Sequence, residues 1–147
     1  MIEHIWLVLC SRSIIDSETN SISLLDILEQ LQIASAPIPD GGVINVTFNF
    51  ELVSLWNRGR DNEPSRGRGR ILVQNPSHTI IGQSEFEIDL SSHQGMRTRT
   101  KSPGLPVQQA GRHFFVIQFQ GHSETEWREV AHIPLDILLT PIESQES

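Results

Sequence analysis

The chain has 147 residues and a net charge of −7, with 11 Lys and Arg against 18 Asp and Glu. A chain of this length fits one domain with a sizeable core, which we place at residues 1–140. The acidic balance argues against a surface that binds DNA or anionic membranes as a whole. The one cysteine, Cys10, has no disulfide partner within the chain and lies in an apolar run. We therefore expect it to be a core residue.

Residues 2–10 predict a strand. The apolar run at 5–10 follows Glu3 and no Lys or Arg, a pattern that fits neither a signal peptide nor a membrane span. We expect a cytoplasmic protein that does not bind membranes. Residues 16–20 predict a polar turn, and residues 21–33 return from it. Their leucine spacing also fits a helix, but a hairpin partner for the first strand is the favoured interpretation.

The clearest strand covers residues 43–52, where apolar and polar residues alternate. A period of two held over this length excludes a helix. The alternation is lost after Leu52, at Val53, Leu55 and Trp56, which predicts a bulge or a strand that leaves the sheet.

Two hairpins follow in the second half of the chain. Residues 71–74 and 79–81 flank Asn75-Pro76-Ser77-His78, whose Asn and Pro favour a type I turn. Residues 114–120 and 127–133 flank a second turn at 121–125. Residues 91–112 contain few large apolar side chains and predict one weak strand near 96–101, then a crossover loop. Residues 141–147 predict a polar, frayed tail.

These elements predict an all-β protein. Seven or eight short strands separated by turns, with at most one short helix, favour an antiparallel β-sandwich of the C2-like or immunoglobulin-like kind.

Five of the eleven basic residues fall between Arg58 and Arg70 in an Arg/Gly tract. If Gln74 and Thr79 close the predicted hairpin, Arg68 faces Glu85 and Arg66 faces Glu87 in cross-strand pairs. The same register sets Gly67 against Phe86. This half of the tract is therefore predicted to be structural. Arg58 and Arg60 stay in the loop beside Trp56, where they could contact a ligand or partner.

RNA or single-stranded DNA binding through this tract is the alternative function. Such binding uses unpaired cations with aromatic residues between them, and no aromatic residue lies between Arg58 and Arg70. Trp127, which follows a turn, is a further candidate contact.

The sequence contains no recognisable catalytic or metal motif. The six histidines lack ligand spacing, and there is no nucleophile elbow or phosphate-binding loop. We expect no metal, no cofactor and no enzymatic activity. The leading prediction is a non-catalytic module that binds a protein partner or associates with itself. A hydrolase-type enzyme with an unrecognised site is the third hypothesis.

Four segments carry a resemblance. They are residues 1–33, the hairpin at 71–82, the stretch from Ser102-Pro103-Gly104-Leu105-Pro106 to 111–115, and residues 131–135. In these the chain resembles a bacterial family of small β-sandwich domains of unknown function. The resemblance implies a β-sandwich and transfers no site residue. The Arg/Gly tract departs from the family's pattern.

Overall fold

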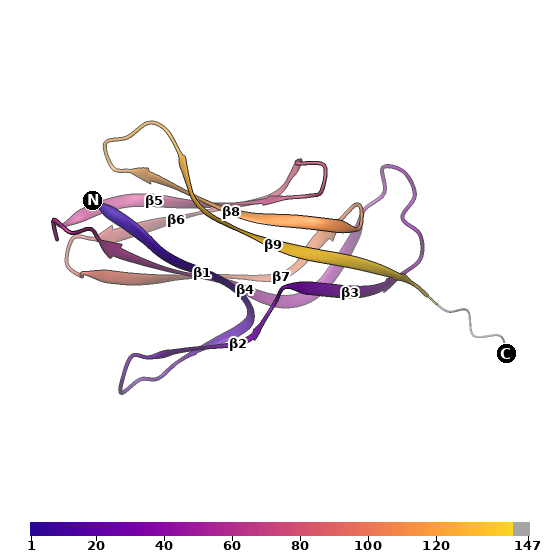
Figure 1. Cartoon of the computed structure of the whole chain (residues 1–147), viewed down its shortest axis with the longest axis horizontal. Helices are drawn as coiled ribbons and strands as arrows, with labels where there is room; N and C mark the ends of the chain where they lie inside the picture. The colour runs from indigo at the N-terminus through magenta and orange to yellow at the C-terminus, as the bar shows by residue number, and fades with distance from the viewer. Residues whose placement is uncertain (143–147) are drawn as a thin grey trace.

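The computed structural model describes residues 1–142, which form nine strands and no helix (Figure 1). The strands are β1 (Ile2–Ile15), β2 (Ile22–Ile27), β3 (Gln30–Ser35), β4 (Ile44–Arg58), β5 (Ser65–Gln74), β6 (Ile80–Leu90), β7 (Gly95–Val107), β8 (Gly111–Gly121) and β9 (Arg128–Pro141). The all-β prediction is confirmed, whereas the predicted number of seven or eight strands is wrong. No helix in this part of the chain is long and apolar enough to cross a membrane.

The strands form two sheets. Sheet A has the order β2-β1-β4-β7, and sheet B has the order β3-β9-β8-β5-β6. All pairs are antiparallel except β3 with β9, which run parallel from Gln30 opposite Asp136 to Ser35 opposite Pro141. The expectation of a wholly antiparallel sandwich is therefore wrong at this edge.

The segment predicted at residues 21–33 is neither one strand nor a helix. It is divided into β2 and β3, which belong to different sheets. The N–H of Leu28 donates to the carbonyl of Leu9 in sheet A at 2.8 Å, while the carbonyl of Glu29 accepts from Asp136 in sheet B at 3.1 Å. Asp26, with φ of 53°, lies just before this crossing, and such left-handed backbone interrupts a regular strand.

β4 and β7 are both longer than predicted. β4 continues past Leu52 to Arg58, so the chain does not leave the sheet there. A bulge does lie opposite Leu55 and Trp56, but its extra residue belongs to β1, between His4 and Trp6. A second register shift, against β7, lies between Thr47 and Phe50. β7 includes Pro103 and Pro106, in the stretch expected to be a crossover loop. Proline cannot donate to a ladder, but an edge strand tolerates it because one side of its backbone is unpaired.

The core lies between the two sheets. Its largest fully buried side chains include Trp56 from sheet A and Phe115 from sheet B. The prediction for Cys10 is confirmed, because it is completely buried. The predicted tail begins at Pro141, the last residue of β9, and its residues 143–147 lie outside the described residues.

Candidate functional site

The outer face of sheet B carries a row of arginines on β5 beside a row of acids on β6. Alternate residues of β5, such as Ile71 and Val73, belong to the core, so the residues between them point outward. The arginine row is Arg66, Arg68 and Arg70, and the acidic row is Glu85, Glu87 and Asp89. The prediction that these two strands pair with basic and acidic residues on one face is confirmed, but the individual partners differ.

The register is displaced by two residues from the predicted one. Arg68 lies opposite Glu87 and Arg66 opposite Asp89, whereas Glu85 and Glu87 were the predicted partners. Arg66 Nε is 3.4 Å from Asp89 Oδ1. Arg68 Nη1 still contacts Glu85, diagonally, at 3.8 Å from Oε2. Both ion pairs are exposed to solvent, so they contribute little to stability.

The turn between β5 and β6 explains the displacement. Gln74 pairs with Ile80 rather than with Thr79, and Val73 pairs with Gly82. The turn therefore displaces the register by one residue. Ile81 is an extra residue on β6, a bulge that displaces the register by one more. Together the two displacements move each partner by two residues along the strand. Because side chains alternate between faces, each one stays on its predicted face.

A cluster of arginine and tryptophan lies next to the rows. The guanidinium carbon of Arg70 is 4.3 Å from the ring centroid of Trp127, and that of Arg68 is 5.5 Å away. Arg70 Nε donates to Gln118 Oε1 at 2.9 Å, and Arg68 Nη2 donates to Gln120 Oε1 at 2.5 Å. We call these five residues the Arg–Trp cluster. The sequence indicated Trp127 and Arg68 separately, and the fold brings them together.

A cleft of about 620 Å³ adjoins the Arg–Trp cluster. Its charged lining residues are two arginines, Arg66 and Arg68, and two glutamates, Glu87 from the acidic row and Glu124 from the turn after β8. Cations and carboxylates are therefore balanced in this cleft. A ligand there would meet both signs of charge within one binding surface.

Trp56 is not a surface contact. Its side chain is completely buried and packs edge-on against Phe86 and His4, with ring centroids 6.1 and 4.8 Å away. Its indole N–H donates to Thr98 Oγ1 at 3.1 Å, within sheet A. The prediction that Trp56 contacts a ligand is wrong, because the strand continues its inward alternation as far as this residue.

Arg58 is also committed within the protein. Its Nε donates to the carbonyl of Leu90 at 2.9 Å and its Nη2 to the carbonyl of Ser91 at 3.1 Å. These bonds join the end of β4 in sheet A to the end of β6 in sheet B. Arg60 is exposed in the turn after β4. The structure therefore does not bring Trp56, Arg58 and Arg60 together as one surface.

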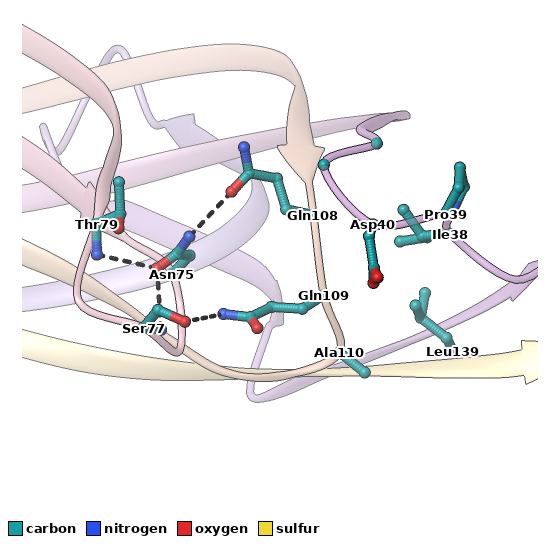
Figure 2. A pocket seen from close by; sticks show the side chains of 12 residues that line it. Ile38, Pro39, Asp40, Asn75, Ser77, Thr79, Gln108, Gln109, Ala110 and Leu139 are labelled. Atoms are coloured by element: carbon teal, nitrogen blue, oxygen red, sulfur yellow. Dashed lines mark hydrogen bonds between the residues drawn. The ribbon is translucent and has the colours of Figure 1, made fainter.

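A second cleft, of about 570 Å³, lies where three loops meet at one end of the sandwich (Figure 2). Asn75 holds the predicted hairpin turn by accepting from the N–H groups of Ser77 and Thr79 at 3.0 and 2.9 Å. It donates to Gln108 at 3.2 Å, and Gln109 donates to Ser77 at 2.8 Å. These amides hold two loops together. The sequence indicated the turn but not Gln108 and Gln109, because they follow the second part of β7, which was predicted as a loop.

The buried thiol and imidazole lie inside the fold. Burial raises the pKa of the Cys10 thiol, and the nearby Glu51 raises it further. Burial lowers the pKa of His113, against a smaller opposite effect of its hydrogen bond to the Gly111 carbonyl. No described residue bonds to His113 Nε2. Both groups are enclosed by protein, so a substrate has no direct access to them.

Neither a metal centre nor a relative adds to this picture. Within residues 1–142, no three His, Cys, Asp or Glu side chains gather as ligands for a metal ion. No protein-family model and no curated protein matches the chain.

Proposed function

We propose that this protein is a non-catalytic module that binds a protein partner through the outer face of sheet B. The observation that carries the proposal is the stacking of Arg70 on Trp127 within the Arg–Trp cluster. Tryptophan and arginine are the residue types most enriched where binding energy concentrates in protein interfaces. Here the two arginines lie on β5, a rigid support, and Trp127 lies against them just before β9.

The cluster is held in place before any partner binds. Gln118 and Gln120 accept hydrogen bonds from Arg70 and Arg68, and Gln120 itself donates to the carbonyl of Thr125 at 2.9 Å. Ordering an arginine side chain on binding costs about 0.5–1.5 kcal/mol. Arginines that are already fixed avoid part of this cost.

The charge pattern favours a protein partner over a nucleic acid. The acidic row runs directly beside the arginine row, so phosphates that approached the arginines would also meet carboxylates. Nucleic-acid binding depends on cations that neutralise phosphates without such competition. The alternative, nucleic-acid binding through Trp56, Arg58 and Arg60, has little support. Trp56 is buried in the core, and Arg58 is bonded to backbone carbonyls. Of the three residues, only Arg60 is available to a ligand.

A hydrolase-type activity has less support. The Cys10 thiol is buried, with a raised pKa, whereas a nucleophilic cysteine needs an accessible thiolate. His113 is enclosed among core residues. Neither group is placed to act on a substrate.

The test compares two tryptophan variants. Tagged wild type, Trp127→Ala and Trp6→Ala are used to capture proteins from the native host, and captured proteins are then purified and titrated. Trp6 is also half-buried and lies outside the core, so it controls for the loss of a tryptophan. We expect Trp127→Ala to raise the dissociation constant by about 30-fold, as loss of an interface hot spot does, and Trp6→Ala to leave it unchanged.

Two results would contradict the proposal. One is that the wild type and Trp127→Ala bind the captured proteins equally well while both remain folded by circular dichroism. The other is salt-sensitive binding of a single-stranded RNA probe near about 50 mM salt that Arg60→Glu weakens, which would favour the nucleic-acid alternative.

A further inference from the structure

Four strands lie at the edges of the two sheets. They are β2 and β7 in sheet A and β3 and β6 in sheet B. An edge strand has unpaired N–H and C=O groups that can pair with another chain. Soluble proteins usually block such edges with charges, prolines, bulges or very short strands.

Three of these edges are blocked. β6 carries the acidic row, including Glu85 and Glu87. β7 contains Pro103 and Pro106, which have no N–H to offer. β2 is interrupted near its end by the left-handed backbone of Asp26. Each of these features disfavours the addition of a further strand.

β3 has none of these features. Its six residues, Gln30–Ser35, contain no charge and no proline, and none of them has a positive φ. The strand pairs with β9 without a register shift and lies on the outside of it (Figure 1). It is a regular, uncharged edge.

Two hydrogen bonds show how the backbone of β3 is oriented. The carbonyl of Glu29 accepts from the N–H of Asp136, and the carbonyl of Ile33 accepts from Thr140 Oγ1 at 3.3 Å. Both donors come from β9 and its side of the sheet. The odd-numbered residues of β3 therefore direct their backbone groups toward β9.

Backbone groups alternate in direction along a strand, so those of Gln30, Gln32 and Ala34 point to the free edge. Among residues 1–142, no strand pairs with that edge. The side chains of the same three residues are exposed, while Leu31 and Ile33 are half-buried and pack against the core.

We propose that two copies of this chain associate by antiparallel pairing of their β3 strands, with Gln32 facing Gln32 of the second copy. In this register Gln30 faces Ala34 of the second copy, so all three residues with free backbone groups lie in pairs that exchange two hydrogen bonds each. Leu31 then meets Ile33 of the second copy on the core side. The pairing joins the two copies of sheet B into one continuous sheet.

The strand itself supports a second copy as the occupant. When β3 is paired antiparallel with a second β3, each outward-facing residue lies opposite a polar or small residue. Each core-facing apolar residue lies opposite another apolar residue. The absence of charge on β3 means that the match places no like charges opposite each other. This surface is separate from the Arg–Trp cluster, so the two proposals stand or fall independently.

The first test removes one free N–H. Gln32→Pro deletes an N–H that points away from β9, so the pairing within the monomer is kept. Gln32→Thr is the matched control, because it changes the side chain but keeps the N–H. By sedimentation equilibrium, the wild type and Gln32→Thr are expected to form dimers as concentration rises, and Gln32→Pro to remain monomeric. A wild type that is monomeric at its highest soluble concentration would overturn the proposal.

The second test reads the register and does not depend on the proline variant being folded. Facing residues of a hydrogen-bonded pair have Cα atoms about 5.5 Å apart, a separation that a disulfide can span. Gln32→Cys is therefore expected to form a covalent dimer on mild oxidation. Gln30→Cys, on the same strand and face, is offset from its counterpart by more than about 10 Å and is expected to stay monomeric on reducing-agent-free gels. Equal cross-linking of the two variants would show that any dimer uses another surface.

Discussion

Replacing Gly69 by alanine is expected to destabilise the fold, because the added methyl group would collide with Phe86. Its Cβ would lie 2.1 Å from Cε2 and 2.2 Å from Cζ of the ring, whereas carbon atoms pack at about 3.5–4.0 Å. The ring would have to move by more than about 1 Å. It cannot move freely, because it packs edge-on against the buried Trp56.

The expected magnitude follows from two opposing effects. Overpacking of this kind costs about 1–3 kcal/mol, and a Gly-to-Ala change recovers about 0.4–1 kcal/mol by restricting the unfolded chain. We expect the free energy of unfolding to fall by about 1–2 kcal/mol. Urea unfolding followed by tryptophan fluorescence measures it, with the slope against urea unchanged.

Gly82→Ala is the matched control on the neighbouring strand. Its Cβ would lie 3.5 Å from Val73 Cγ2, an ordinary contact, so the free energy of unfolding should stay the same or rise by up to about 1 kcal/mol. In a Phe86→Leu background, Gly69→Ala should cost about 1 kcal/mol less than in the wild type. Equal stability of the two alanine variants, or an equal cost of Gly69→Ala in both backgrounds, would refute the reasoning.

Three further outcomes follow from buried and braced side chains. Burial lowers the pKa of His113 and His4, so protons bind the unfolded chain more tightly, and stability is lost as the pH falls below the ordinary value of 6.5. His113→Leu should reduce the difference in urea midpoint between about pH 8 and about pH 5; an unchanged difference would contradict this. Arg58→Ala should lower the free energy of unfolding by about 1.5–3 kcal/mol, because its hydrogen bonds to the backbone carbonyls are lost. Arg60→Ala should change it by less than about 0.5 kcal/mol. Similar losses for the two variants in a urea titration would show that the Arg58 bonds do not stabilise the fold. The Cys10 thiol should react with a disulfide reagent rapidly in urea and very slowly in the folded protein, and fast reaction without urea would show that it is accessible.

The parts of the fold that could be predicted are those that depend on local sequence patterns. The alternation up to Leu52 located β4, and turn residues located both later hairpins. The inward position of Trp56 was also available, since it has the same parity as Phe50 and Leu52. Val53 obscured it: this residue is fully buried although it lies on the opposite face of the strand from Leu52, so both faces of the strand appear apolar there.

The parts that could not be predicted depend on distant partners. Pro103 and Pro106 are typical of a loop, and only the edge position of β7 makes them compatible with a strand. The sheet change after Leu28 depends on β9, far along the chain. The displaced partners of Arg66 and Arg68 follow from a turn one residue longer than predicted and from one bulge, and a bulge leaves little trace in a single sequence.

The parallel pairing of β3 with β9 also constrains the order of assembly during synthesis. β3 lies near the start of the chain, and its only partner among the described strands is the last one. A ribosome must therefore release all the strands from β4 to β9 before β3 gains a neighbour, and contacts between such distant segments form slowly. Until then both edges of β3 are unpaired. During synthesis, β3 is therefore the segment most exposed to pairing with a wrong strand.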